Sequence, residues 1–487
     1  MSGRASGGAR EFAAVDLGAT SGRVILGRIG PSELELRHVA RFPNEPVTLR
    51  DGLHWDVLGL YRSVLAGLAA AVRQRADIAS VGIDSWAVDY ALMREGRMLG
   101  LPYHYRDEHR GLLGPSELHR TFDHAALFAR NGLQFLPFNT VYQLAAEPSL
   151  DEADALLLIP DLLAFELTGV VAAERTNAST TGLLEARTRE WDPVVADAVG
   201  ARRLLPELID PGASLGALSG AAGEAVGATM PLVAVGSHDT ASAVVAVPAT
   251  TDDFAYISCG TWGLVGVELE EPVLTDAARE ASFTNEGGVD GRVRFLHNVM
   301  GLWLLSESIR TWLGPGASAA QQSSALEELL AQAAEVQASM PVFDVDDPRF
   351  LAPGDMPARI SAWFSERGMP VPASRAELVR SIIESLAQAF AETVRAASTL
   401  SGKRVSAIHM VGGGAQNRLL CQATADRAEL PVIAGPVEAT AIGNLLVQAR
   451  AAGALSGSLE SLRALVAATQ APETYTPRTT RETVRNG

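Results

Sequence analysis

Asp239 has the side chain and the position of a general base. It lies in GSHDTAS, residues 236–242, between an apolar run at 230–235 that predicts a strand and a helix that follows. A carboxylate there is expected to project, beside His238 and Thr240, into the region where α/β sheets collect ligands, and it could take the proton of a hydroxyl group. The alternative is an N-cap aspartate of the helix. The two roles are compatible because they use different oxygens.

Two short turns rich in glycine and hydroxyl groups, one in each half of the chain, could hold a polyphosphate. The first lies in VDLGATSGRVILGRI, residues 15–29, and the second in YISCGTWGLVGVEL, residues 256–269. Each joins two β-type runs and so predicts a hairpin, whose bare backbone lets N–H groups approach phosphate oxygens. An ordinary hairpin explains one such turn. The pair, together with Asp16 and Arg23, indicates two lobes that grip one nucleotide.

Asp16 and Arg23 flank the first turn and have opposite charges. Asp16 could orient the waters of a Mg²⁺ ion, which usually takes one or two carboxylates and keeps several waters. Arg23 could meet phosphate oxygens with its fork of donors. The alternatives are a turn-capping aspartate and a solvated arginine.

Other phosphate-binding designs do not fit. A P-loop needs Gly-Lys followed by Ser or Thr, but Lys403 is the only lysine and Arg404 follows it. A Rossmann fingerprint needs a helix after the first strand, whereas residues 24–26 favour a second strand. GGGAQN, residues 412–417, lies between a predicted strand and helix, and could present bare backbone to an adenosine phosphate or ring. A tight strand-to-helix turn is its alternative reading.

Composition limits the class of protein. The 487 residues exceed what one hydrophobic core usually organises, so we expect two domains. The net charge of −17 argues against nucleic acid or an anionic membrane as a partner. Cys259 and Cys421 are too few for a disulfide scaffold, and neither a secretory signal nor a membrane helix is recognisable. We therefore expect a soluble cytoplasmic protein.

The elements that position these groups follow from the apolar pattern. Strands are predicted at 12–17, 23–29, 33–42, 78–83, 230–235, 254–258 and 405–411, and helices at 57–75, 116–130, 161–167 and after 374, 418 and 438. The helix after 374 begins with a capping box, Ser374 with Glu377, and ends at Gly402. Small residues near Gly443 let the last of these helices pack closely.

The chain should divide into a disordered leader, residues 1–10, an N-terminal domain at 11–248, a C-terminal domain at 249–470 and a polar tail at 471–487. The second half repeats the order of strand, turn and strand found at the start of the first. This order indicates a duplicated architecture.

With those residues in place, the chain resembles the FGGY carbohydrate kinases over about residues 12–477. The stretches that carry the resemblance are VDLGATSGRV, GIDSWAVDY from Gly82, GLQFLPFNTVYQL from Gly132, SHDTASAV, SCGTWGL, TNEGGVDGR, NVMGLWLL from Asn298, VGGGAQN and AGPVEAT.

The resemblance implies an α/β fold of two ribonuclease-H-like domains, of the actin and hexokinase ATPase type, with the active site in a cleft between them. The first domain would bind the sugar and carry the base, and the second would bind the nucleotide. Matched position by position, Asp239 is the catalytic base. The sugar contacts are Ala87, His238, Asp239, Thr240 and Asn298; the ATP contacts are Ala19, Thr20, Ser21, Gly22, Arg23, Thr261, Ser306 and Gly413.

Two of these positions depart from the family pattern. Ala87 stands where a glycine offers backbone to the sugar, so its methyl group could narrow the sugar pocket. Ser306 replaces a glutamine and could reach ATP only through water.

The resemblance implies an ATP- and Mg²⁺-dependent phosphotransferase that acts on the C1 hydroxyl of L-rhamnulose, a step of rhamnose catabolism. One alternative is a kinase of the same fold for another ketose or polyol, such as L-fuculose, xylulose or ribulose. Another is a sensor that binds sugar or nucleotide without catalysis. Asp16, Arg23 and Asp239 together argue against the sensor.

Overall fold

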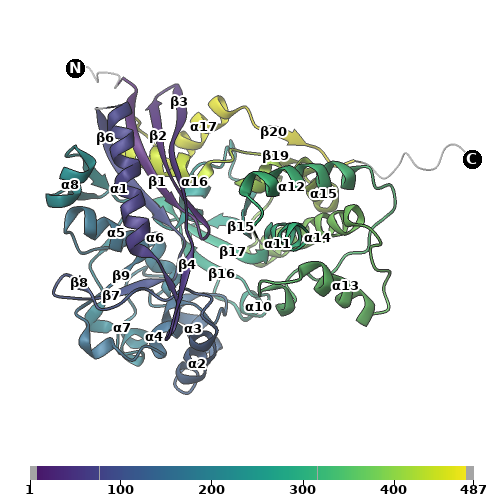
Figure 1. Ribbon diagram of the computed structural model, residues 1–487, viewed down its shortest axis with the longest axis horizontal. Coiled ribbons are helices and arrows are strands. Elements are labelled where there is room, and N and C mark those ends of the chain that lie inside the picture. The colour runs from purple at the N-terminus through teal and green to yellow at the C-terminus, as the bar shows by residue number, and fades with distance from the viewer. Residues whose placement is uncertain (1–7, 76, 315, 479–487) are drawn as a thin grey trace, which may run out of the picture. The chain divides into compact units, whose positions relative to one another are not determined.

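The computed structural model describes residues 8–75, 77–314 and 316–478 (Figure 1). Its packing divides the chain into two compact units, and neither is a continuous segment. Unit 1 takes the described residues of Met1–Thr250 with Glu268–Phe295 and Glu438–Ala471, and unit 2 takes Thr251–Val267, Leu296–Val437 and the described part of Pro472–Gly487. The predicted division at 248/249 stays a prediction, and most of the predicted leader, residues 1–7, lies outside the described residues.

A six-stranded mixed sheet forms the centre of unit 1, in the order β12-β13-β6-β1-β2-β3. Its strands are β1 (Arg10–Leu17), β2 (Ser21–Gly30), β3 (Glu33–Pro43), β6 (Ile78–Ser85), β12 (Ser214–Ala217) and β13 (Pro231–Val233). β1 runs parallel to β6 and antiparallel to β2. The predicted first hairpin and the third strand are therefore confirmed.

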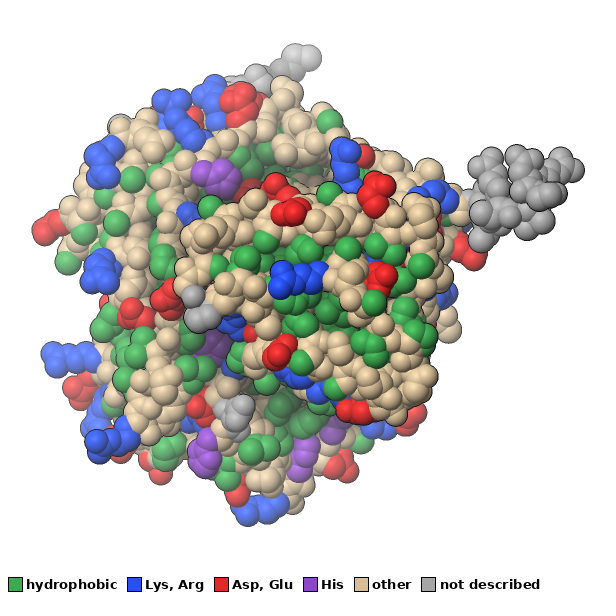
Figure 2. Space-filling view, turned by 45° about the vertical axis from the view of Figure 1, so that its right-hand side comes forward, with side chains coloured by type: hydrophobic (Ala, Val, Ile, Leu, Met, Phe, Trp, Pro, Cys, Tyr) green, Lys and Arg blue, Asp and Glu red, His purple; other side chains and the backbone are tan. Residues whose placement is uncertain are grey.

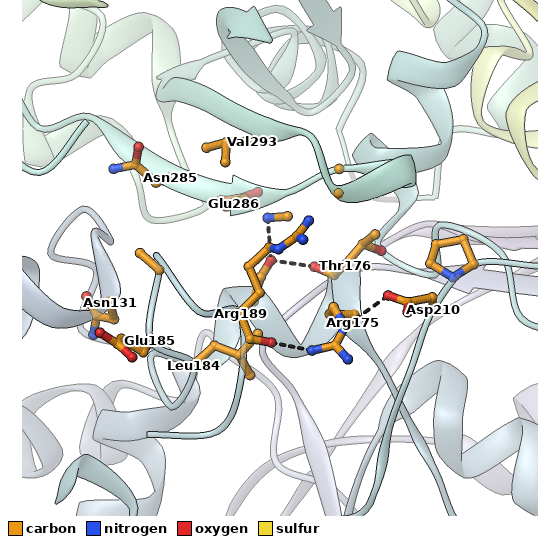
Figure 3. A pocket seen from close by; sticks show the side chains of 16 residues that line it. Asn131, Arg175, Thr176, Leu184, Glu185, Arg189, Asp210, Asn285, Glu286 and Val293 are labelled. Carbon is orange, nitrogen blue, oxygen red and sulfur yellow. Dashed lines mark hydrogen bonds and ion pairs between the residues drawn. The ribbon is translucent and has the colours of Figure 1, made fainter. Parts of the chain in front are cut away.

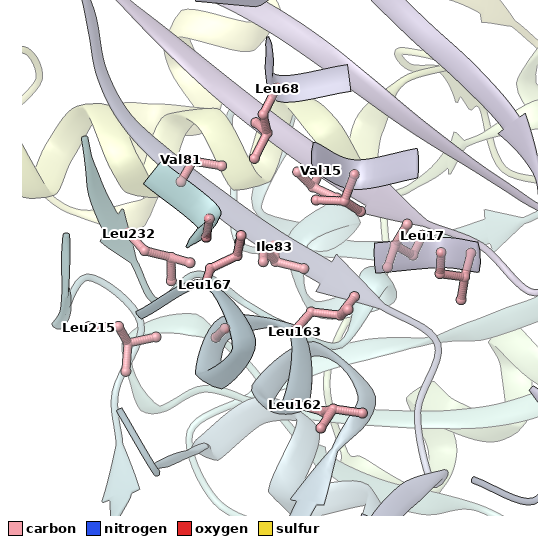
Figure 4. Close-up of a cluster of buried hydrophobic side chains, with 14 of the residues drawn as sticks. Val15, Leu17, Leu68, Val81, Ile83, Leu162, Leu163, Leu167, Leu215 and Leu232 are labelled. Atoms are coloured by element: carbon pink, nitrogen blue, oxygen red, sulfur yellow. The ribbon is translucent and has the colours of Figure 1, made fainter. Parts of the chain in front are cut away.

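Helices cover both faces of this sheet. α1 (Val57–Gln74) packs against β2 and β3, and α16 (Ala439–Ala451) packs against β1, β2 and β6. The two faces alternate along β2, where Val24 meets Gly67 of α1 and Gly27 meets Leu445 of α16. Figure 4 shows the core on the α1 side, where β1, β6 and β13 bring Val15, Ile83 and Leu232 toward α5.

The remaining elements of unit 1 are mostly short. The other strands are β4 (Pro46–Leu49), β5 (Gly52–Trp55), β7 (Tyr90–Arg94), β8 (Arg97–Met98), β9 (Ala155–Leu158), β10 (Ala173–Glu174), β11 (Leu208–Ile209) and β16 (Thr284–Gly287). The other helices are α2 (Glu108–Leu118), α3 (His124–Asn131), α4 (Thr140–Ala145), α5 (Ile159–Thr168), α6 (Arg175–Ala178), α7 (Pro193–Ala198), α8 (Gly220–Val226), α9 (Asp239–Val245), α10 (Asp276–Glu280) and α17 (Leu459–Gln470).

The strands of unit 2 belong to a seven-stranded sheet with the order β16-β17-β15-β14-β18-β19-β20. They are β14 (Phe254–Cys259), β15 (Trp262–Leu269), β17 (Val293–Met300), β18 (Ala407–Val411), β19 (Val432–Ala434) and β20 (Glu473–Tyr475), with β15 and β17 continuing into residues of unit 1. The helices are α11 (Trp303–Leu313), α12 (Ala319–Ala334), α13 (Met356–Glu366), α14 (Arg375–Ser401) and α15 (Arg418–Ala428). The second hairpin, β14 with β15, is confirmed. β20 lies in the segment predicted as a polar tail and pairs with β19.

Short 3₁₀ helices link several of these elements. They are η1 (Leu150–Glu152), η2 (Ser179–Thr181), η3 (Arg202–Leu204), η4 (Val289–Gly291), η5 (Pro348–Phe350) and η6 (Gly413–Gln416).

Two local predictions differ from the structure. The helix predicted at 116–130 is broken between Leu118 and His124, because Asp123 accepts a hydrogen bond from Ala126 N (2.8 Å) and so begins α3. At the start of α14, Ser374 caps Glu377 N as predicted. The Glu377 carboxylate, however, accepts from Ala373 N and not from Ser374 N, so the reciprocal half of the capping box is shifted by one residue.

The surface carries mixed charge. On the face shown in Figure 2, basic side chains lie scattered among acidic and neutral ones and do not gather into one patch. None of the helices in the described part of the chain has the length and hydropathy needed to span a bilayer.

Candidate active site

Three aspartates converge at one edge of the sheet in unit 1. Asp16 ends β1 opposite Asp84 on the parallel strand β6, and opposite Arg23 on the antiparallel strand β2. Asp239 is the first residue of α9, after β13, and its charge raises the pKa of both Asp16 and Asp84. The structure therefore brings Asp16, Arg23 and Asp239 together as the sequence predicted, and it adds Asp84.

Asp16 is held in a network that has more negative than positive charge. Arg23 Nε lies 2.9 Å from Asp16 Oδ2, and Arg23 NH1 donates to Glu438 Oε2 at 2.6 Å. Burial raises the pKa of Asp16 to about 6; Arg23 lowers that pKa, whereas Asp239 and Glu438 raise it.

Asp84 is fully buried beside Asp16. Asn444 Nδ2 of α16 donates to Asp84 Oδ2 at 2.6 Å, and Gln448 Nε2 donates to Asn444 Oδ1 at 2.6 Å. Burial, and then the charge of Asp16, raise the pKa of Asp84 well above its usual value. Among the described residues Asp84 Oδ1 has no hydrogen-bond partner. That oxygen is free to accept a water or a cation.

Asp16→Asn should change the pH dependence of stability in a defined direction. Folding raises the pKa of Asp16 from 3.8 to about 6, so its stabilising contribution is present below the unfolded pKa and is lost as pH rises through about 6. The wild type should therefore lose stability relative to Asp16→Asn between about pH 4 and about pH 6, the two pKa values that bound the effect. Denaturant midpoints of both proteins, measured without nucleotide or metal, test this; a constant difference would contradict the assigned pKa.

Asp239 is placed for contact with a ligand. Its side chain is 32% exposed, and its Oδ1 accepts a hydrogen bond from Thr240 Oγ1 at 3.0 Å. It is not the N-cap of α9: that position belongs to His238, and no side chain caps the helix. The alternative role considered from the sequence is therefore absent.

His238 is oriented by two residues that the sequence reasoning missed. The buried Arg294 donates from NH2 to His238 Nδ1 (2.9 Å), and the same nitrogen of Arg294 lies 3.1 Å from Glu286 Oε2. Nδ1 also lies 3.3 Å from Glu286 Oε2, and the other ring nitrogen, Nε2, lies 3.4 Å from Asp239 Oδ1. The Glu286 carboxylate keeps the buried guanidinium paired.

A buried glutamate fixes the segment that precedes the base. Glu174 Oε2 accepts from Ser237 N (2.9 Å) and from Ser237 Oγ (2.7 Å), while its other oxygen accepts from Thr176 N. Ser85 N in turn donates to Ser237 O at 2.9 Å. The Ser237–Asp239 segment is thus tied both to α6 and to the end of β6.

The first turn is small and held by Asn44, which also went unpredicted. Gly18 N donates to Ser21 O (2.9 Å), Asn44 N donates to Thr20 O (3.0 Å), and Asn44 Nδ2 donates to Gly18 O (2.9 Å). A Cβ on Gly22 would lie 2.3 Å from the Phe42 ring, so this glycine is required by packing. Ala19, Thr20 and Ser21 form the accessible part of the turn.

The residues predicted to contact ATP in unit 2 surround one sheet edge. β14 and β18 are parallel neighbours, so the Gly260–Thr261 turn and the 412–417 turn follow adjacent strands. Leu302 N donates to Gly260 O (2.9 Å) and Trp303 N donates to Thr261 O (3.2 Å), which joins the start of α11 to the same place. Ser306 is exposed in the first turn of α11.

The glycines at this edge differ in what surrounds them. A Cβ on Gly414 would lie 2.4 Å from Cys259 Cβ, and one on Gly412 would lie 3.0 Å from Cys259 O. A Cβ on Gly413 would meet only Leu302 Cδ1 and Cys259 O, at 3.7 and 3.9 Å, and one on Gly260 would meet nothing within 4 Å. Packing therefore requires Gly414, the left-handed φ of +80° favours glycine at 412, and space is left beside Gly413 and Gly260.

The two remaining predicted sugar contacts lie in different units. Ala87 is partly exposed in the turn after β6 in unit 1, and Asn298 is partly buried on β17 in unit 2.

A pocket in unit 1 is lined by side chains that include Arg175, Asp210 and Glu286 (Figure 3). Much of its polar lining is already bonded within the protein: Arg175 Nε donates to Asp210 Oδ1 (2.9 Å), and Asn285 Nδ2 donates to Gly132 O (3.0 Å). Glu286 on its wall is the carboxylate that lies 3.3 Å from His238 Nδ1. The aspartate cluster, with its free carboxylate oxygens, remains the stronger candidate site.

Comparison with known proteins identifies the family. Residues 12–246 match the N-terminal domain of the FGGY family of carbohydrate kinases, and residues 255–452 match its C-terminal domain. The chain belongs to the FGGY family of carbohydrate kinases. As a member of this family it is a sugar kinase, which uses ATP with a divalent metal and a sugar as acceptor.

Curated relatives of this FGGY kinase are similar over nearly its whole length. A rhamnulokinase of Klebsiella pneumoniae subsp. pneumoniae is 41% identical over 487 aligned residues, covering 98% of this chain and 96% of the relative. A rhamnulokinase of Bacteroides thetaiotaomicron is 37% identical over 476 residues, covering 96% of each.

Solved structures agree on the fold of this FGGY kinase. A ligand-bound xylulose kinase from Lactobacillus acidophilus superposes with a TM-score of 0.75 at 16% identity, covering 96% of this chain and 94% of that one. Plasmodium falciparum glycerol kinase with ADP gives a TM-score of 0.75 at 15% identity, covering 98% and 95%. The predicted fold class, a two-domain α/β kinase, is confirmed.

Proposed function

We propose that this enzyme transfers the γ-phosphoryl group of ATP to the C1 hydroxyl of L-rhamnulose, in rhamnose catabolism in the cytoplasm. The partly exposed Asp239 carboxylate beside Asp16 and Asp84 carries the assignment of the chemistry. The relatives called rhamnulokinase, 37% and 41% identical to this chain, support the choice of sugar.

Asp239 acts as the general base. One of its oxygens takes the proton of the C1 hydroxyl as O1 forms its bond to the γ-phosphorus and ADP leaves. The hydrogen bond from Thr240 Oγ1 to Oδ1 (3.0 Å) limits rotation of the carboxylate, so the second oxygen keeps one direction. The buried Arg294 holds the His238 ring, and His238 and Thr240 are the sugar contacts that flank the base. Ala87 and Asn298 are proposed as further sugar contacts.

Mg²⁺ is the proposed metal, and the residues present fit it. The site offers the carboxylate oxygens of Asp16 and Asp84, one of them buried with no hydrogen-bond partner among the described residues, in a group with an excess of negative charge. Oxygen ligands and one or two carboxylates are what Mg²⁺ takes when it also binds phosphates and waters. When bound, it would neutralise charge on the phosphates.

ATP is proposed to contact both glycine turns. Residues Ala19–Arg23 would meet the phosphates from unit 1, and Thr261 would meet them from unit 2, with backbone N–H groups as donors. Gly413 and Ser306 would meet the nucleotide from unit 2. The space beside Gly413 is not filled by protein atoms, which supports that role.

Gly413→Ala should weaken ATP binding without unfolding the protein. The new Cβ makes ordinary contacts at 3.7 and 3.9 Å, so the unfolding midpoint should not change. Filling the space should raise the KM for ATP about tenfold, ~1.4 kcal/mol of binding, while the KM for the sugar stays constant. Gly414→Ala, whose Cβ would clash with Cys259 at 2.4 Å, is the matched control and should lower stability. An unchanged ATP KM in Gly413→Ala would remove Gly413 from the site.

The substrate is tested by ADP release with Mg-ATP and a panel of L-rhamnulose, L-fuculose, L- and D-xylulose, L-ribulose and glycerol. We expect L-rhamnulose to be preferred by about tenfold or more in kcat/KM, ~1.4 kcal/mol in the transition state. Preference for another sugar would retain the kinase activity but change the substrate, and the methyl group of Ala87 would then be the first residue to test. Sugar binding without turnover of any of them would favour a sensor.

A further inference from the structure

The first stretch after β6, which carries Ala87, is held in a strained turn. Asp89 N donates to Ala87 O (2.9 Å) across Val88, whose φ is +67°. A three-residue turn with positive φ at its centre is rare, and a β-branched residue there is a conformational outlier. Such strain persists only where the surroundings enforce it, and it clusters at functional sites.

The buried carboxylate of Asp89 holds the strained turn at Val88 in place. Its Oδ2 accepts from Trp55 Nε1 (2.6 Å), from Trp86 Nε1 (3.1 Å) and from Tyr105 N (3.2 Å), and its Oδ1 accepts from Gln143 Nε2 (2.9 Å). Asp89 is 1% exposed, and burial raises its pKa to about 7, while these donors act in the opposite direction. A carboxylate with four donors is fixed in position and fixes its donors in return.

These contacts join two stretches that are distant in sequence. Trp86 and Asp89 come from GIDSWAVDY, and Gln143 comes from GLQFLPFNTVYQL, the stretch that also supplies Thr140. Thr140 Oγ1 donates to Val88 O at 2.6 Å, so the turn is gripped at its carbonyl as well. The Trp86 ring packs on the Trp55 ring with centroids 4.1 Å apart.

The other end of the turn is tied to the base-bearing segment. Trp86 N donates to Leu17 O (3.2 Å), next to Asp16, and Ser85 N donates to Ser237 O (2.9 Å), two residues before Asp239. The backbone at Ala87 is therefore presented at a fixed place relative to Asp239.

We propose that Asp89 is a positioning residue for the sugar: it holds the Trp86–Val88 turn so that the backbone at Ala87 meets the acceptor near Asp239. This rests on the proposed function, because Ala87 is a sugar contact only if the enzyme is a sugar kinase of the stated kind. Asp89 touches neither reacting group, so it acts through Trp86 and the turn. Loss of the Asp89 carboxylate should therefore raise the KM for the sugar and leave the KM for ATP unchanged.

The test compares Asp89→Asn with wild type by steady-state kinetics, using the sugar that wild type prefers in the panel. Asparagine keeps the shape of aspartate but places an amide N–H₂ among N–H donors, which breaks the network. We expect the KM for the sugar to rise at least about tenfold, ~1.4 kcal/mol, with the KM for ATP within about twofold. Asp192→Asn is the matched control: Asp192 is buried and binds Arg130 and the start of α7, away from the turn.

A second variant separates positioning from stability. Trp86→Phe keeps an aromatic ring but removes the indole donor to Asp89, so it should raise the sugar KM in the same direction, and the double variant should be no worse than Asp89→Asn alone. If Asp89→Asn does not fold, Trp86→Phe decides the question by itself.

Three results would overturn the inference: an unchanged sugar KM in either variant, an equal rise in the ATP KM, or an equal rise of the sugar KM in Asp192→Asn. Turnover by wild type of a sugar other than L-rhamnulose overturns the proposed substrate but leaves Asp89 testable with that sugar. A wild type that phosphorylates no sugar overturns both.

Discussion

Asp239→Asn is expected to lower kcat by about 10²–10⁴-fold, the usual contribution of general-base catalysis. The amide has the same shape and can still accept the hydrogen bond from Thr240, but it cannot take the proton of the acceptor hydroxyl. Substrate binding should persist, because the sugar and ATP are held mainly by other groups. ADP release at saturating ATP and sugar measures the first effect, and calorimetric titration of the sugar measures the second.

The stability of Asp239→Ala separates the general base from an N-cap. An N-cap aspartate costs about 1 kcal/mol when it is replaced by alanine. Since His238 occupies the N-cap position and Asp239 is 32% exposed, Asp239→Ala should change the free energy of unfolding by less than about 0.5 kcal/mol. Near-wild-type turnover in a normally folded variant would exclude Asp239 as the base.

Gly443→Ala is expected to destabilise unit 1 by about 1–3 kcal/mol or more. The helices α16 and α9 touch at this point, and a Cβ on Gly443 would lie 1.8 Å from Ser242 O. The obstructing atom is backbone, so no side chain can rotate away, and the two helices must separate. Because α9 begins at Asp239, turnover should fall as well.

Gly111→Ala is the matched control for that substitution. Gly111 is also inside a helix, α2, but a Cβ there would meet nothing within 4 Å. Alanine at an open helical site should stabilise by about 0.5–1 kcal/mol, because glycine loses more conformational freedom on folding. Urea unfolding of the two variants should therefore shift in opposite directions. A shift of the same sign and size would show that the approach of α16 to α9 is not close-packed.

Much of the fold was accessible from local patterns. The hairpins β1–β2 and β14–β15 follow from β-branched runs on either side of a glycine turn. The helix α14 follows from an apolar residue every fourth position, the Ser374 cap and the left-handed Gly402. The break before α3 was missed because the capping bond of Asp123 competes with an otherwise continuous helical pattern.

The residues of the candidate site also fall into those that local sequence reveals and those that only the folded chain brings together. Asp16 and Arg23 are separated by one hairpin, and Asp239 lies in a short polar run after a strand, so their types and spacing were visible in the sequence. Glu438 and Asn444 were not, because they lie 415 and 360 residues from their partners Arg23 and Asp84. No local sequence pattern indicates that Glu438 will accept a hydrogen bond from the guanidinium group of Arg23.

The sequence by itself determined the elements, the glycine turns and the residue types for phosphoryl transfer, because propensity, apolar period and capping act within a few residues. Only the tertiary structure decided which carboxylates share one charge network, which glycines are required by packing and which residue holds the Trp86–Val88 turn. Burial and close approach set the pKa of Asp16, the open space beside Gly413 and the four donors on Asp89. These quantities depend on chain segments that meet only when the sheets are formed.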